Sequence, residues 1–145
     1  MALVRCILEM GMGVDIHGKD YTSAAKRAVF DALHHSSLGF QRLLGKTADD
    51  MRVDITIGIP YPRAVDKDAV VATLPHGTGY IKVVQGGLEI PSENGQDACV
   101  IANAAVMGSF DDGKEPATQH PSEAIPQPLS SRGWGIALRQ GSRPL

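Results

Sequence analysis

The sequence predicts an α/β (α+β) two-layer sandwich, in which two helices cover one face of a four-stranded mixed sheet. Short apolar stretches of strand length alternate with helical patterns in the order β-α-β-α-β-β. Hydrophobic residues make up 43% of the 145 residues, which is enough for a core in a chain of single-domain length. The composition changes after residue 110, so we expect a single domain over residues 1–110.

Residues 111–145 are predicted to form a disordered C-terminal tail. The segment is rich in Pro, Ser, Gln and Gly, and its few large apolar residues include Trp134, Ile136 and Leu138. Such a composition buries too little surface to offset the entropy that is lost on ordering. A short docking motif around Trp134 is the alternative interpretation.

The first strand and helix are predicted on either side of a glycine-rich segment. Residues 3–10 form an apolar run of strand length, and Gly11 and Gly13 are expected to end it. Residues 22–44 carry apolar side chains at helical spacing. The candidate caps and stops of this helix are Asp20, Thr22, Gly39 and Gly45.

The remaining elements follow from hydrophobic periodicity and turn residues. Residues 51–59 alternate apolar and polar side chains, which predicts a strand with one buried face. Residues 66–74 are expected to form a short helix. Residues 79–85 predict a third strand, which residues 88–91 would continue beyond a double-glycine bulge. Residues 98–107 are almost wholly apolar, which predicts a central strand.

Charge and motif content argue against several classes of function. The chain carries 14 Lys and Arg against 16 Asp and Glu with no basic run, so we expect no nucleic-acid partner. No apolar segment approaches the ~18 residues of a membrane span, and the N-terminus does not resemble a signal peptide. We therefore expect a cytoplasmic protein without membrane contact. Cys6 and Cys99 are expected to be reduced and buried.

The segment Gly11-Met12-Gly13-Val14-Asp15-Ile16-His17-Gly18 is predicted to carry the chemistry. Its glycines allow the backbone to turn and to approach a ligand closely. Asp15 and His17 are two positions apart, so in extended backbone they would point to one side as an acid/base pair. Asp20 follows at the start of the helix, where exposed N–H groups favour an anion.

Two alternatives to an acid/base pair stay open. Asp15 and His17 would also suit a divalent metal together with Asp20 or a distant ligand. In a purely structural role, Asp15 would cap backbone N–H groups and His17 would pack at an interface. The segment lacks the third glycine of a dinucleotide site and the ending of a phosphate-binding P-loop. The sequence identifies no cofactor, and we assign no metal ligand.

Two further polar residues are candidates for a ligand site. A bulge at the double glycine would re-aim Glu89, and Asn103 interrupts an apolar strand, where it would act as a structural clamp or line a cleft. The residues expected to contact a ligand, beside Asp15 and His17, are Gly11, Gly13, Gly18, Asp20, Glu89 and Asn103.

Five stretches together resemble a family of conserved hypothetical proteins named after a Listeria locus, Lin0512. They are the GxGxDxHG segment, His34-His35-Ser36-Ser37-Leu38, Asp54-Ile55-Thr56-Ile57-Gly58-Ile59-Pro60, Gly86-Gly87-Leu88-Glu89 and Ala102-Asn103-Ala104-Ala105-Val106. The resemblance spans about residues 4 to 107. It implies that Gly11, Gly13, Asp15, His17 and Gly18 match the family signature, and it brings no reaction with it.

The order of elements also resembles the fold of the trimeric, Bacillus-type chorismate mutases, in which small ligands bind between subunits. This likeness concerns the fold alone. We expect a protein that binds a small polar or anionic metabolite at the GxGxDxHG segment, with acid/base chemistry there. The alternative is a non-catalytic homo-oligomeric assembly or ligand-sensing module.

Self-association is expected in either case. A sheet with helices on one side leaves its other face bare, and Leu3, Ile7 and the apolar last strand offer many large side chains. A closed homo-oligomer would cover them, and the fold analogy suggests a trimer.

Overall fold

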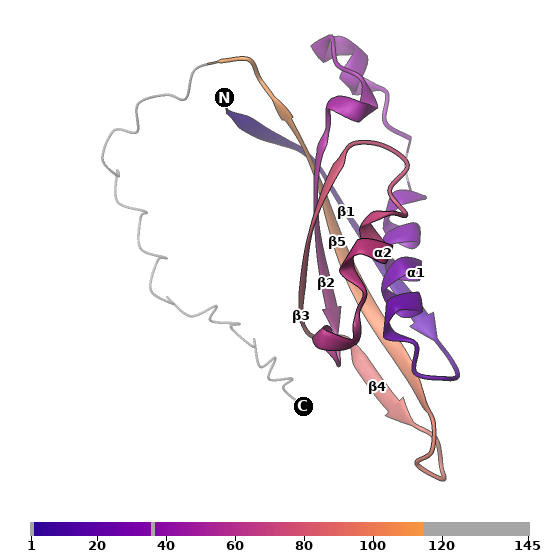
Figure 1. The fold of residues 1–145 in the computed structure, drawn as a ribbon. Coiled ribbons are helices and arrows are strands. Elements are labelled where there is room, and N and C mark those ends of the chain that lie inside the picture. The colour runs from indigo at the N-terminus through magenta and orange to yellow at the C-terminus, as the bar shows by residue number, and fades with distance from the viewer. Residues whose placement is uncertain (1, 36, 115–145) are drawn as a thin grey trace, which may run out of the picture. The chain divides into compact units, whose positions relative to one another are not determined.

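A computed structural model of the chain describes residues 2–35 and 37–114. Two helices lie on one face of a five-stranded sheet (Figure 1). The elements are β1 (Leu3–Asp15), α1 (Tyr21–Leu33), β2 (Arg52–Ile59), α2 (Lys67–Val71), β3 (Thr78–Gln85), β4 (Leu88–Pro91) and β5 (Ala98–Asp111). The tail is predicted over 111–145; Asp111 belongs to β5, and residues 115–145 lie outside the described residues.

The sheet has the order β1-β5-β2-β3, with β4 paired to the beginning of β5. β5 runs antiparallel to β1 and β2, and β2 runs parallel to β3. The prediction of four strands is wrong, because residues 88–91 leave β3 and form a strand of their own. The turn by which the chain passes from β3 to β4 requires a glycine at position 87. Gly87 has φ +61°, and a Cβ there would lie 2.1 Å from the Ile101 carbonyl oxygen.

The prediction that Gly11 and Gly13 end the first strand is also wrong, since β1 continues through both to Asp15. Both glycines face α1. A Cβ on Gly11 would lie 2.3 Å from the Ala28 carbonyl oxygen, and a Cβ on Gly13 would lie 2.1 Å from that of Ala24. The two glycines therefore let a helix rich in small residues close directly onto the strand.

The first helix is shorter than its periodicity predicts. Asp20 caps its start by accepting a hydrogen bond of 2.9 Å from the Ser23 amide, as expected. It ends at Leu33, and residues 40–44 form a separate 3₁₀ turn. The Phe40 ring packs edge-on against Phe110, which holds this turn over the sheet. Tertiary packing thus overrides a helical pattern that runs on to residue 44.

The core lies between the helices and the sheet. The alternation predicted for residues 51–59 is confirmed, because every second side chain of β2 is buried there. The core also contains alanines and Val29 of α1, Val70 of α2 and the even-numbered residues 100–106 of β5. None of the described helices is long and apolar enough to cross a membrane.

Three residues are more exposed than the sequence predicts: Asn103, on the face of the sheet opposite the helices, and the two cysteines. Asn103 is exposed there rather than buried among apolar neighbours, because odd-numbered residues of β5 point away from the helices. Cys6 is exposed at a bulge of β1, and Cys99 is half-buried. Both are free thiols, as predicted, but neither is fully buried.

Candidate functional site

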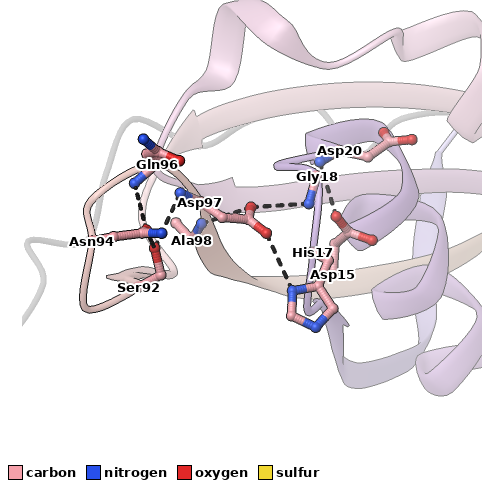
Figure 2. A network of polar contacts seen from close by, with 9 residues as sticks. All are labelled: Asp15, His17, Gly18, Asp20, Ser92, Asn94, Gln96, Asp97 and Ala98. Carbon is pink, nitrogen blue, oxygen red and sulfur yellow. Dashed lines mark hydrogen bonds and ion pairs between the residues drawn. The ribbon is translucent and has the colours of Figure 1, made fainter.

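Residues 15–20, which begin within the GxGxDxHG segment and which we call the signature segment, meet the hairpin loop between β4 and β5 at one end of the sheet. Figure 2 shows residues 15–20 facing residues 92–98. The hairpin loop is fixed by its own hydrogen bonds: Ser92 Oγ donates to Asn94 Oδ1 at 2.7 Å, and the Asp97 amide donates to Ser92 Oγ at 3.1 Å. This rigid loop presents the Asp97 carboxylate to the signature segment.

Asp15 holds the strand and the helix together. Its side chain is 10% exposed, and Arg27 Nη1 donates to Oδ1 at 2.9 Å. The Asp20 amide donates to Oδ2 at 2.9 Å. Arg27 also donates to the Val14 carbonyl oxygen at 2.6 Å. Both carboxylate oxygens are therefore engaged by the protein, which matches the structural role left open by the sequence.

His17 pairs with Asp97 rather than with Asp15. Its Nδ1 lies 3.2 Å from Asp97 Oδ2, and the ring is 86% exposed. The chain leaves β1 after Asp15 and turns at Gly18, where φ is +93°. The two-residue periodicity of extended backbone, on which the expected pair was based, no longer holds at His17.

Asp97 gathers three hydrogen-bond donors from both sides of the site. Its Oδ1 accepts from the Gly18 amide at 3.0 Å and from the Ala98 amide at 2.8 Å. The Gly18 and Ala98 amides, and after them His17, keep the pKa of Asp97 below its usual range because they stabilise the carboxylate. Asp97 is thus an anion that locks the signature segment onto the hairpin.

Lys19 has an unusual backbone conformation. Its φ is +51°, a left-handed conformation that costs a residue with a Cβ roughly 1–2 kcal/mol. Hydrogen bonds flank it on both sides, from the Gly18 amide to Asp97 and from the Asp20 amide to Asp15. The surroundings therefore impose this conformation, and strain held in this way is typical of functional sites.

A polar pocket opens beside Lys19. It has a volume of about 530 Å³ and is lined by Lys19, Tyr21, Tyr61, Glu89, Pro91, Gly95, Asp97 and Ala98. The volume lies within the range of roughly 300–1,000 Å³ of small-molecule sites. The first residue of α1, the turn after β2, β4 and the hairpin loop all contribute, so the pocket forms only in the folded domain.

Tyr21 and Glu89 form a pair within the polar pocket. The Tyr21 hydroxyl donates to Glu89 Oε1 at 2.9 Å, and both residues are half-buried. Burial, together with the Glu89 carboxylate that accepts this proton, raises the pKa of Tyr21 to about 12. Tyr21 therefore stays a neutral donor at physiological pH and orients the carboxylate. The Tyr61 ring lies 5.7 Å from the Tyr21 ring, centroid to centroid.

The structure brings some of the predicted site residues together and separates others. Glu89 lines the polar pocket, and Gly18 and Asp20 are bonded into the segment that borders it. Gly11 and Gly13 lie behind, against α1, and Asn103 is on the other face of the sheet. Among residues 2–35 and 37–114, no group of three or more His, Cys, Asp or Glu side chains is placed to hold a metal ion.

Sequence reasoning missed Tyr21, Tyr61, Arg27 and Asp97. The hairpin signal Asn94-Gly95 predicts a turn, but nothing in it indicates that the turn presents Asp97 to a segment 79 positions earlier. Tyr21 begins the helix, where an aromatic residue is ordinarily read as part of the packing. These contacts depend on the path of β4, which the sequence places wrongly.

Comparisons with known proteins agree with this fold. The chain is similar to the crystal structure, at 1.22 Å resolution, of an FtsZ-like protein of unknown function from Nostoc punctiforme PCC 73102. The TM-score is 0.71 at 35% identity, and the match covers 77% of this chain and 98% of that one. No curated protein matches the chain. The model of the conserved hypothetical protein family Lin0512_fam matches residues 5–108, so the predicted resemblance is confirmed and the chain belongs to this family.

Proposed function

We propose that this protein binds a small polar metabolite in the polar pocket, with Glu89 as its acid/base group. The observation that carries the proposal is the hydrogen bond of 2.9 Å between Tyr21 and Glu89 in a pocket that Lys19 also lines. A half-buried carboxylate, a phenol and an ammonium group on one small concave surface are a typical set of convergent polar groups.

Each of these groups has a distinct role in binding. Tyr21 donates to Oε1 of Glu89 and fixes the plane of the carboxylate. The other oxygen, Oε2, can then accept a hydrogen bond from a ligand or remove its proton. Lys19 complements an anionic group of the ligand, and the aromatic rings of Tyr21 and Tyr61 provide an apolar wall. The ligand class is therefore a small molecule with one anionic group and one donor.

The residues of the GxGxDxHG segment do not line the polar pocket but hold the structure beside it. Asp15 is engaged by Arg27 and the Asp20 amide, so its carboxylate is committed to structure. His17 and Asp97 fix the conformation of Lys19 at the border of the pocket. By analogy with the trimeric chorismate mutases, whose ligands lie between subunits, a neighbouring copy would close the open side of the pocket.

A thermal-shift screen with matched variants tests the proposal. The probes are inorganic phosphate, acetate, succinate, glycine and glutamate at millimolar concentration. A ligand at 100 times its Kd stabilises a protein by about 2.7 kcal/mol, which raises the Tm of a domain of this size by several degrees. We expect at least one carboxylated probe to raise the Tm of the wild type, with a smaller effect in Lys19→Met.

Glu89→Gln is the decisive variant, and Glu93→Gln is its control. Glu93 is an exposed residue in the neighbouring hairpin and is not among the residues that line the polar pocket. We expect Glu89→Gln to abolish the stabilisation by a probe that carries a donor, and Glu93→Gln to retain it. Stabilisation that persists in Glu89→Gln would overturn the assignment of this pocket.

A further inference from the structure

The sheet face opposite α1 and α2, which we call the open face, is strongly apolar. Alternation along each strand places every second residue on it, and the pairing of neighbouring strands aligns these residues in rows. Seven large side chains on this face are at least half exposed in the described part of the chain: Leu3, Leu8, Met10, Met12, Tyr80, Leu88 and Ile90. Contiguous patches of this kind mark interaction sites.

We propose that a second copy of this chain covers the open face, so that two sheets pack face to face. The seven side chains come from β1, β3 and β4 and extend across the sheet. The inference is independent of the polar pocket, whose Glu89 lies on the helix side of β4 opposite Val100.

The charges of the open face favour a copy of the same face. The Arg52 guanidinium donates to both oxygens of Asp54, at 2.9 and 3.0 Å, and lies 4.1 Å from the centre of the Tyr80 ring. The ion pair of Arg52 and Asp54 therefore adds no net charge to the open face. Arg5 and Asp111 lie at the ends of their strands, and Lys82 lies on the edge strand β3. A nearly balanced apolar surface suits a copy of itself better than a strongly charged partner.

Packing of faces is favoured over strand addition at β1. Asp31 of α1 accepts a hydrogen bond of 2.8 Å from the Met12 amide, and Arg27 donates to the Val14 carbonyl oxygen. Side chains of α1 therefore occupy the backbone groups that an added strand would need along this stretch of the edge. The apolar side chains of β1 remain available on the open face.

The family comparison favours a copy over the C-terminal segment as the occupant. The family match ends at residue 108, and the Nostoc relative is covered over 98% of its length by 77% of this chain. The residues that follow in this chain therefore have little counterpart in that relative. A second copy is an occupant that every member of the family can supply.

Sedimentation velocity of the full chain at about 10 μM tests the proposal. We expect the wild type to sediment as a multiple of its 15.4 kDa mass. Met10→Glu on β1 and Ile90→Glu on β4, each of which places a charge among the apolar side chains of the open face, should each give the 15.4 kDa species. Leu43→Glu is the matched control, because Leu43 is equally apolar and 88% exposed but lies on the 3₁₀ turn outside the open face.

Reactivity of Cys99 provides a second readout if a variant folds poorly. Cys99 faces Ile90 on the open face, so a covering copy should slow its reaction with a thiol reagent. We expect reaction at least tenfold faster in a folded, monomeric Met10→Glu variant than in the wild type. A monomeric wild type, or an oligomer that Met10→Glu and Ile90→Glu leave intact, would overturn the proposal. So would oligomers that appear only after deletion of residues 115–145.

Discussion

The Tyr21 hydroxyl donates a hydrogen bond of 2.9 Å to Glu89, a residue 68 positions later in the chain. This bond joins the first residue of α1 to β4 and places a phenol and a carboxylate in the same pocket. The pairing also changes the acid–base behaviour of Tyr21, whose pKa rises to about 12. The pair is therefore accessible to direct measurement by titration.

Ultraviolet titration should detect the raised pKa of Tyr21. We expect the absorbance of tyrosinate to show one group that titrates near pH 12 in the folded protein. Tyr21→Phe should remove this group, whereas Tyr80→Phe should retain it, because Tyr80 lies on the open face away from Glu89. A spectrum in which the highest pKa persists in Tyr21→Phe would show that the pair does not form.

The same shift predicts how stability depends on alkaline pH. The pKa of Tyr21 is higher in the folded protein than the value of about 10 of an unfolded chain, so the folded state binds this proton more tightly. Its contribution is complete below pH 10 and is lost as the pH rises through about 12. The free energy of unfolding should therefore fall less steeply above pH 10 in Tyr21→Phe than in the wild type. Parallel curves would contradict this.

Gly13→Ala should be destabilising for a reason of packing. A Cβ at this position would lie 2.1 Å from the Ala24 carbonyl oxygen, a backbone atom that can move only with the helix. We expect a loss of at least about 1–3 kcal/mol in urea unfolding, as for other overpacked sites. Gly39→Ala is the control, since no atom lies within 4 Å of its Cβ, and it should change stability by less than about 1 kcal/mol. Equal effects of the two changes would refute close packing at Gly13.

Asp15→Asn should lower stability without removing ligand binding. The substitution removes the charge of a side chain that is 10% exposed and that accepts hydrogen bonds from Arg27 and from the Asp20 amide, which should cost about 1–3 kcal/mol of unfolding free energy. Asp49→Asn is the control, because Asp49 forms an exposed pair with His76 and such pairs contribute about 0–1 kcal/mol. If Asp15→Asn instead kept full stability and lost all probe binding, Asp15 would belong to the ligand site.

Sequence patterns predicted the parts of the fold that depend on residues close together in the chain. The alternation of residues 51–59 reflects one buried face, and it appears in β2 as predicted. Asp20 caps its helix because a carboxylate accepts from an exposed amide of the first turn, a requirement that is local in sequence. Membership of the family was likewise predicted from local stretches of sequence, and the family model matches residues 5–108.

The site depended on contacts between distant segments and was predicted only in part. Gly11 and Gly13 have the composition of a loop, but they serve the approach of α1 to a strand that continues through them. The partner of His17 is Asp97, which becomes available only because β4 leaves β3 and turns back along β5. Glu89 was singled out because a bulge at the double glycine would re-aim its side chain, and it lines the polar pocket. Tyr21, its partner, carries no such signal.

Mapping of amide chemical shifts in the ¹⁵N-labelled full chain tests the ligand site most directly. A carboxylated probe from the thermal-shift screen is titrated into the wild type and into Glu89→Gln. We predict shifts in the wild type that are concentrated at the amides of residues 18–21, 61, 89 and 95–98, which border the polar pocket, and their loss in Glu89→Gln. Shifts that cluster instead around the open face, or that are unchanged in Glu89→Gln, would contradict the assignment.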